Sequence, residues 1–205
     1  MTLRFDHLAV AAETLRDGAA AVEAALGVPL EPGGQHARMG THNRLLSLGP
    51  GEYLEVIAID PDARAPATPR WFDLDRFSGP PRPVVWIAGC DDLEAALSAA
   101  PSGAGRPVDF ARGDLRWRMA VPDDGRLPFD NLFPALTEWQ GTARAAARLP
   151  DRGCRLEALV LSHPEADALR RALGQLADET RLRILRGAPS LSARIRTPEG
   201  VRDLG

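Results

Sequence analysis

An α+β fold of repeated βαβββ units, forming a curved and partly open mixed sheet with flanking helices, is predicted by three observations. A short apolar segment of strand character is followed by a helical pattern and then by further extended segments. This order occurs three times along the 205 residues. Glycine and proline separate the extended segments, as they do in turns. Each pass covers roughly 50–70 residues, so the passes are internal repeats and do not form a solenoid.

The first unit is expected over residues 1–60. Residues 3–11 have the short apolar character of a strand. Thr14 is the expected N-cap of an alanine-rich helix that Gly27 ends. Three extended segments follow, at residues 34–40, 41–48 and 52–60.

A connector rich in proline and arginine, residues 61–81, leads to the second unit at residues 82–141. A strand at 83–89 precedes a helix that Asp91 is expected to cap. Extended segments are expected at residues 108–113, 115–122 and 128–139.

The third unit, residues 152–205, is expected to be a shorter βαββ unit. A strand at 156–162 precedes a helix at 164–177 with proline in its first turn. Extended segments follow at residues 181–187 and 191–198, and residues 201–204 are a candidate for one more. Two units can join edge to edge around a concave cleft, because one unit alone leaves a sheet face and an edge exposed. All units then form one compact domain, and which two of them pair stays open.

Composition excludes several classes of function. The net charge of −3 gives no reason to expect nucleic acid. No apolar run approaches the roughly 20 residues that span a bilayer, and the start of the chain lacks a signal-peptide pattern, so we expect a cytoplasmic protein. All 25 basic residues are arginine, which excludes Schiff-base chemistry and a lysine phosphate loop. Cys90 and Cys154 lie far apart and are expected to be buried thiols. Motifs of serine hydrolases, dinucleotide-binding proteins and zincins do not occur.

One stretch, HARMGTHNRLLSLGPGEYLEVI at residues 36–57, resembles the glyoxalase-like domain family of the vicinal-oxygen-chelate superfamily. That family has a histidine on its first strand, then His-Pro, Met-Gly-Thr-x-Asn and Tyr-Leu-Glu. The matching residues here are His7, His36, Met39, Gly40, Thr41, Asn43, Tyr53, Leu54 and Glu55. Ala37 stands where proline is usual. Leu127-Pro128-Phe129, followed by Glu138-Trp139, resembles a strand of the second unit.

The resemblance implies a divalent metal ion (Mg²⁺, Mn²⁺, Zn²⁺ or Ni²⁺) bound by His7, Glu55 and Glu138. His7 and Glu55 lie in apolar strands, where an unpaired polar group is costly. Alternating side chains place Glu55 on one face with Tyr53 and Ile57. Alternatives stay open: His7 as a core residue, Glu55 paired with arginine, and Glu138 as a surface carboxylate.

The fourth ligand position is incomplete. The residue that matches His7 is Val84 in the second unit, which cannot bind a metal, and Glu157 in the third. A ring-cleaving dioxygenase is disfavoured, because no second histidine occupies a matching position.

A second cluster, His36, Arg38, His42 and Arg44, occupies even positions near the Gly40-Thr41 turn. We expect His36, Arg38 and Arg44 to bind an anionic substrate, with His42, or alternatively His36, as an acid or base and Glu55 as a second proton-transfer group. The alternative is a solvated hairpin face. Asn43, at an odd position, is expected to stabilise the turn.

Several aromatic residues have two interpretations each. Trp71 and Phe72 are expected either in a lid over the cleft or in a packed connector helix. Trp86, Trp117 and Trp139 are core residues or contacts of a homodimer. His163 is expected beside a helix cap.

The resulting hypothesis is a metal-dependent lyase or isomerase acting on a small oxygenated, anionic molecule, with the ion stabilising an enolate. A rival is a small-molecule binding or resistance protein that sequesters an apolar ligand in the same cleft without catalysis. A third hypothesis is a structural dimerisation module, in which His7 and Glu55 lie apart.

Overall fold

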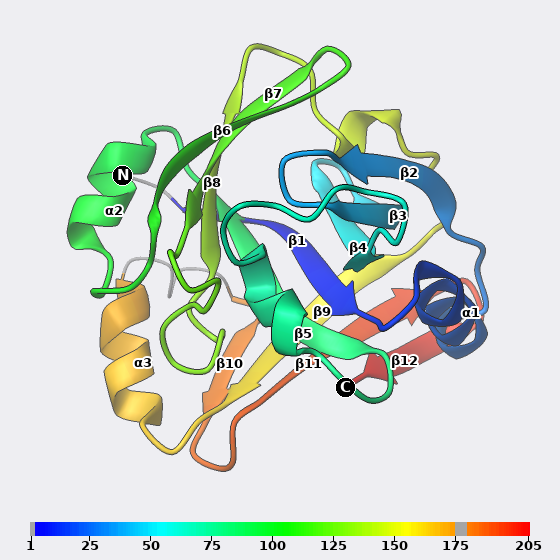
Figure 1. Ribbon diagram of the computed structural model, residues 1–205. Coiled ribbons are helices and arrows are strands. Elements are labelled where there is room, and N and C mark those ends of the chain that lie inside the picture. The colour runs from blue at the N-terminus through cyan, green and yellow to red at the C-terminus, as the bar shows by residue number, and fades with distance from the viewer. Residues whose placement is uncertain (1–2, 175–179) are drawn as a thin grey trace.

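The computed structural model of the protein describes residues 3–174 and 180–205. Eight strands form one mixed sheet that curls into a half-barrel, in the order β2-β3-β4-β1-β5-β8-β7-β6 (Figure 1). Its strands are β1 (Arg4–Ala11), β2 (Glu31–His36), β3 (Thr41–Gly49), β4 (Glu52–Ile59), β5 (Arg82–Gly89), β6 (Arg106–Arg112), β7 (Leu115–Val121) and β8 (Ala135–Gln140). The predicted α+β class with a curved mixed sheet is confirmed.

The first two units join through their first strands. β1 pairs with β5 in antiparallel orientation, and each pairs in parallel with the last strand of its own unit, β4 or β8. The outermost strands, β2 and β6, approach each other across the open side. There Arg38 Nη1 donates to the carbonyl oxygen of Asp109 at 3.4 Å, and the Arg38 guanidinium lies 5.9 Å from the centre of the Phe110 ring. The half-barrel therefore encloses a cleft between its two units.

The third unit forms a sheet of its own, in the order β10-β9-β11-β12. Its strands are β9 (Arg155–Ser162), β10 (Leu182–Leu185), β11 (Ser190–Thr197) and β12 (Gly200–Leu204). Strand β12 contains residues 201–204, the candidate for one more extended segment. Leu156, Leu159 and Ile195 belong to one buried cluster with Leu54 and Trp86 of the half-barrel. The third sheet therefore covers the outer, convex face of the half-barrel, below it in Figure 1.

The helices also pack on the outer side. They are α1 (Leu15–Leu26), α2 (Leu93–Ala99) and α3 (Ala166–Leu173). Two short 3-10 segments, η1 (Trp71–Arg76) and η2 (Ala146–Arg148), instead contribute Trp71, Phe72 and Ala146 to the buried cluster on the inner side. Thr14 accepts a hydrogen bond from the Asp17 amide and Gly27 ends α1 at φ 70°, as predicted. The cap of α2 is Asp92, because its side chain accepts from the Ala95 amide; the prediction of Asp91 was wrong, and Asp91 pairs with Arg4.

Helix α3 begins where the side chain of His163 accepts from the Glu165 amide at 3.0 Å, which confirms His163 beside a helix start. The helix was predicted to residue 177, and residues 175–177 lie outside the described part of the chain. Cys90 and Cys154 are both buried and unpaired among the described residues, as expected. Across the described ranges, no helix combines the length and apolarity that crossing a membrane requires.

The edge strand β2 differs from the prediction of residues 34–40. It begins at Glu31, and its residues after His36 turn back, with the amides of Met39 and Gly40 both donating to the His36 carbonyl. Pro32-Gly33-Gly34 has the composition of a turn, yet it lies within β2: Pro32 pairs with Arg44 of β3, and the register shifts between Pro32 and Gln35. Glycine is required at Gly33, since a Cβ there would lie 2.1 Å from Asn43 Oδ1.

Strand β8 is also shorter than the predicted 128–139. Phe129, Asp130 and Asn131 adopt left-handed backbone conformations, with φ of 57°, 53° and 67°. Asn131 Oδ1 accepts from the Leu127 amide at 2.7 Å, a side-chain contact that favours a turn over a strand. The paired strand therefore begins only at Ala135.

Candidate functional site

A bulge in β1 places Asp6 and His7 beside each other at the cleft. Phe5 belongs to the outer cluster and His7 lines the cleft although they are two residues apart, and the pairing with β5 shifts between them. Asp6 Oδ1 lies 2.6 Å from His7 Nδ1, and Asp6 Oδ2 accepts from Trp139 Nε1 at 2.8 Å. Asp6 thus fixes the His7 ring, leaves Nε2 directed into the cleft, and links the two units.

Glu55 comes from β4, whose side chains alternate between the two faces. Tyr53 and Ile57 belong to the inner cluster, whereas Leu54 and Val56 belong to the outer one. Glu55 Oε2 lies 3.6 Å from His7 Nε2, longer than a hydrogen bond but within reach of an ion pair. Tyr53 stacks on the His7 ring at 4.3 Å. The structure therefore brings His7 and Glu55 together, both of them buried.

Asn43 and His36 complete the polar wall. Asn43 Nδ2 donates to Glu55 Oε1 at 2.5 Å, and Asn43 Oδ1 accepts from the Gly34 amide at 2.7 Å. His36 Nδ1 lies 3.0 Å from Thr41 Oγ1, and His36 Nε2 lies 3.9 Å from Glu55 Oε1. Two histidines therefore flank one carboxylate, each held through its Nδ1.

One arginine reaches this wall from the second unit. Arg112, at the end of β6, places Nη1 3.3 Å from Asn43 Oδ1 and 3.5 Å from His36 Nε2. Both contacts are with uncharged groups when His36 is neutral, and within residues 3–174 and 180–205 Arg112 forms no ion pair with a carboxylate. The cleft therefore contains a guanidinium whose charge is not neutralised by direct contact.

The environment separates the pKa values of the two histidines. Burial opposes a charge on His7, but the hydrogen bond to Asp6 and the nearby Glu55 carboxylate outweigh it and raise the pKa of His7 to about 9. Burial, reinforced by the charge of Arg112, lowers the pKa of His36 to about 4 despite the attraction of Glu55. At neutral pH, His7 is therefore an imidazolium and His36 a neutral imidazole.

Glu55 is the anion that faces both histidines. Burial alone would raise its pKa, but the contact with His7 and the hydrogen bond from Asn43 contribute to lowering it to about 2. Because His36 is neutral above pH 4, the charged partner of Glu55 is His7. The polar wall is thus a buried ion pair with a neutral imidazole beside it.

Aromatic rings form the opposite wall. Phe110 stacks on Trp117 at 5.4 Å, and Trp117 lies 5.6 Å from Trp139. Trp71 and Phe72 of η1 stack on each other at 5.1 Å and fill the space in front of this wall. A cavity of about 30 Å³ remains between the walls, lined by residues of both, and it has room for one or two water molecules.

Residues 70–77, which we call the strap, contain this aromatic pair. Phe72 and Asp73 both have left-handed backbones, with φ of 61° and 57°, which costs on the order of 1–3 kcal/mol per residue. Within residues 3–174 and 180–205, neither Arg70 Nε nor Trp71 Nε1 has a hydrogen-bond partner although both atoms are buried. The strap contains a short 3-10 helix, and its aromatic side chains enter the cleft. It therefore has features of both expected structures, a lid over the cleft and a packed connector helix.

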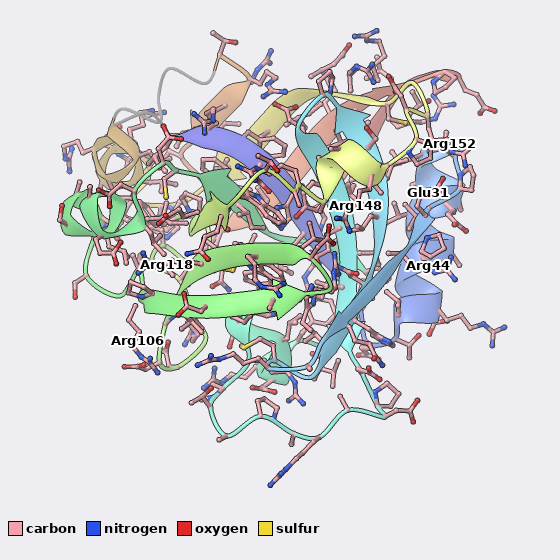
Figure 2. The ribbon with its side chains drawn as sticks, turned by 90° about the horizontal axis from the view of Figure 1, so that it is seen from above. Glu31, Arg44, Arg106, Arg118, Arg148 and Arg152 are labelled. Carbon is pink, nitrogen blue, oxygen red and sulfur yellow. The ribbon has the colours of Figure 1, made fainter. Side chains whose placement is uncertain are left out.

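The remaining predicted site residues lie elsewhere. Glu138 faces the outer side, where its carboxylate accepts from the Leu93 amide at the start of α2 and lies 3.5 Å from Arg118 (labelled in Figure 2). His42 and Arg44 share the outer side of β3, because Asn43 between them faces inward. Figure 2 shows Arg44 on the side of α1. Arg38 lies in the turn after β2 and contacts β6.

The donors present do not fit a divalent metal ion. Among the described residues, no group of three or more His, Cys, Asp or Glu side chains is arranged to hold one. Glu138 lies on the other face, and the second unit presents Val85, Ile87 and Thr137 to the cleft. The Arg112 guanidinium, 3.5 Å from His36 Nε2, would repel a dication there. The expected three-ligand set is therefore not assembled, and Glu157 pairs with Arg196 on the third sheet.

Sequence reasoning missed Asp6 and Arg112 and assigned Asn43 to the turn. The parity of β3 was the available signal for Asn43, since Thr41, Asn43 and Leu45 alternate with His42 and Arg44. Asp6 depends on the bulge in β1, and Arg112 depends on the approach of β6 to β2. Neither leaves a local pattern in the sequence.

Comparison with known proteins agrees with this architecture. The model of the family described as glyoxalase-like domain matches residues 5–177. The chain therefore belongs to the glyoxalase-like domain family. No curated protein matches it.

Solved structures resemble the fold at low sequence identity. A hypothetical protein from Staphylococcus aureus has a TM-score of 0.61 at 13% identity, covering 91% of this chain and 87% of its own. Methylmalonyl-CoA epimerases from Streptomyces coelicolor and Mycobacterium tuberculosis are 15% and 20% identical. Both have TM-scores of 0.44 over 70% of this chain and cover 100% and 91% of their own. These likenesses concern the fold alone.

Proposed function

We propose that the protein is a lyase or isomerase that moves a proton on a small oxygenated anion bound in the cleft. The observation that carries the proposal is the arrangement of His7 and His36 on either side of Glu55, with pKa values moved in opposite directions. Pairs of titratable groups whose pKa values are pushed apart are typical of acid–base sites. His7, His36 and Glu55 are also buried, which strengthens the electrostatic interactions between them.

The proposed roles follow from the protonation states at neutral pH. The neutral His36 removes a proton from a carbon next to a carbonyl group, and the C–H electron pair becomes the C=C bond of an enolate. The negative charge develops on the carbonyl oxygen, to which the Nε2–H of His7 donates. Asp6 and Glu55 keep His7 protonated, and Asp6 also holds its ring. Returning the proton elsewhere completes an isomerisation, and expelling a group from the neighbouring carbon completes an elimination.

Arg112 gives this proposal its preference for anions. A carboxylate on the ligand would take the uncompensated guanidinium as its partner, preferably in bidentate geometry. Arg112 would then leave His36 Nε2, where its charge lowers the His36 pKa. Binding of an anion therefore makes His36 a stronger base at the moment when the base is needed.

Solvent exchange tests the proposal whichever product the reaction forms. The protein is incubated in D₂O with 2-oxo-, 3-oxo- and 2-hydroxycarboxylates, and ¹H NMR follows replacement of C–H by C–D. We expect a bell-shaped pH profile of kcat/KM with limbs near pH 4 and pH 9, since in the free protein His36 must be neutral and His7 protonated. His7→Gln and His36→Gln are each expected to slow exchange about 100-fold or more.

The control is His42→Gln, on the outer face of β3. Its exchange rate is expected to match that of the wild type. Equal loss of exchange in all three variants would contradict the assigned roles. Binding of the carboxylates with no exchange of any of them would favour the rival, a binding or resistance protein, for which the aromatic wall is the supporting observation.

A further inference from the structure

The cleft has no room for a ligand while the strap is in place. Known ligand pockets have volumes of roughly 300–1,000 Å³, whereas the space left beside Trp71 and Phe72 is about 30 Å³. Both side chains are only 3% exposed, so they occupy the volume between the polar wall and the aromatic wall. A ligand can enter that volume only when they leave it.

The strap has features of a segment that can leave. Two consecutive non-glycine residues hold left-handed backbones, and Trp71 Nε1 has no partner among the described residues. The ion pairs that hold the strap lie at the rim: Arg70–Asp75 at 2.5 Å, Arg76–Asp73 at 2.6 Å and Arg126–Asp73 at 3.6 Å. Partly exposed pairs of this kind contribute little to stability. The strap is therefore held mainly by the packing of its aromatic side chains, together with a hydrogen bond from the Asp73 amide to the Gly125 carbonyl oxygen at 2.8 Å.

The surface that the strap covers defines what can replace it. The ring centre of Trp71 lies 5.0 Å from that of Phe110 at an interplanar angle of 36°, and 5.0 Å from that of His36 at an angle of 78°. Phe110 continues in a stack to Trp117. The volume of the indole is therefore bounded by aromatic rings, and a flat ring system restores the contacts that Trp71 would lose.

The charge at the closed end defines the other part of the ligand. Arg112 lines the same cavity as Trp71 and Trp117, and its nearest contacts are with the amide of Asn43 and the imidazole of His36. A carboxylate beside Arg112 would complete a charge-assisted pair. Ring and carboxylate are therefore needed in one molecule.

We propose that the ligand is a planar aromatic carboxylate whose ring takes the place of Trp71 and whose carboxylate binds Arg112. This names the class of ligand that binds, and it rests on the proposed proton transfer only for the statement that a member of the class with a C–H bond next to a carbonyl group also reacts. In the ligand-free protein, Trp71 and Phe72 compete with the ligand for the same space. The strap is thus an internal competitor that a ligand displaces.

Equilibrium binding tests the proposal with three probes: 2-naphthoate, the uncharged 2-naphthylmethanol and the saturated cyclohexanecarboxylate. Titration calorimetry on the full chain is expected to show tightest binding of 2-naphthoate. The uncharged and saturated probes are expected to bind about tenfold or more weakly, since each lacks one of the two interactions. Equal affinities for all three probes would overturn the proposal.

Single-residue variants test the two roles separately: that of Trp71 as a competitor and that of Arg112 as the residue that binds the carboxylate. Trp71→Ala is expected to bind 2-naphthoate about tenfold more tightly, because the competing side chain is gone. Arg112→Gln is expected to bind 2-naphthoate about tenfold more weakly. The control is Arg116→Gln, which is expected to bind it as tightly as the wild type does. Arg116 is an exposed arginine of β7 whose hydrogen bonds go to backbone oxygens. Weaker binding by Trp71→Ala would show that Trp71 is part of the site and would overturn the displacement.

Amide hydrogen exchange gives a measurement that does not depend on how the variants fold. In the wild type, 2-naphthoate is expected to speed exchange of residues 70–77 severalfold. Unchanged or slower exchange there would contradict displacement of the strap. Failure of the proton-transfer proposal alone would give a different result. The protein would still bind 2-naphthoate, but His7→Gln and His36→Gln would not slow the C–H to C–D exchange of the carboxylates tested in D₂O.

Discussion

Replacing Glu55 with glutamine is expected to lower the free energy of unfolding at pH 7 by about 2–3 kcal/mol. The substitution keeps the shape of the side chain and an oxygen for Asn43, but it removes one of the two carboxylates that contact His7 among the described residues and leaves Asp6. Loss of a proton by His7 limits the cost, because a neutral imidazole needs no counter-charge. Denaturant titration of both proteins measures the difference.

The free energy of unfolding of the wild type is expected to depend on pH, and the shifted pKa values fix the direction of the change. Between pH 6.5 and about 9 the folded wild type holds a proton on His7 that the unfolded chain has lost, so its stability falls as pH rises through this range. Below pH 6.5 the unfolded chain binds a proton at His36, whereas the folded protein binds it only below about pH 4. The stability therefore also falls as the pH is lowered through this range. Glu55 adds to the acid limb between pH 4.5 and about 2.

In Glu55→Gln the alkaline limb is expected to flatten in part, because Glu55 is, after Asp6, the second carboxylate that raises the pKa of His7. Glu157→Gln is the matched control, since Glu157 pairs with Arg196 at 3.0 Å on the surface. That change is expected to cost less than about 1 kcal/mol and to leave the alkaline limb intact. An unaltered alkaline limb in Glu55→Gln would refute the ion pair.

The second large effect is expected at the contact between the third sheet and the half-barrel. Leu159→Ala is expected to lower the free energy of unfolding by about 2–5 kcal/mol, the range for buried leucines. Leu159 is 2% exposed and belongs to the cluster that joins β9 to the convex face of the eight-stranded sheet. Thermal or denaturant unfolding provides the measurement.

Leu185→Ala is the matched control for Leu159→Ala. Leu185 is 53% exposed at the end of β10, in the same sheet, and its loss is expected to change stability by less than about 0.5 kcal/mol. Similar effects of the two substitutions would mean that the third sheet does not pack on the half-barrel. A single cooperative transition in the wild type is a further consequence of the shared core.

Sequence patterns predicted the order of strands and helices well because they depend on neighbours along the chain. The alternation of β4 placed Glu55 with Tyr53 and Ile57, as the structure has it. Alternation also grouped His42 with Arg44 correctly, but alternation does not say which face is the inner one. Asn43 faces the cleft, so its two neighbours face outward.

The same ambiguity applies to Glu138. Thr137 and Trp139 line the cleft, so Glu138 between them faces α2, and its apparent match to a metal ligand lies on the wrong side of the sheet. Arg112 could not be predicted, because it reaches the site only through the curvature that brings β6 toward β2. Contacts that depend on sheet curvature are set by the packing of the whole domain, and local residue patterns do not report them.

The central claim is that His7 is a buried imidazolium held between Asp6 and Glu55. NMR titration of the His7 ring, assigned by comparison with His7→Gln, measures its protonation directly in the folded wild type. A midpoint near pH 9, and an Nδ1–H signal that persists at neutral pH, are expected. A midpoint at or below pH 6.5 would contradict the claim, because His7 would then be neutral at pH 7 and unable to act as the acid.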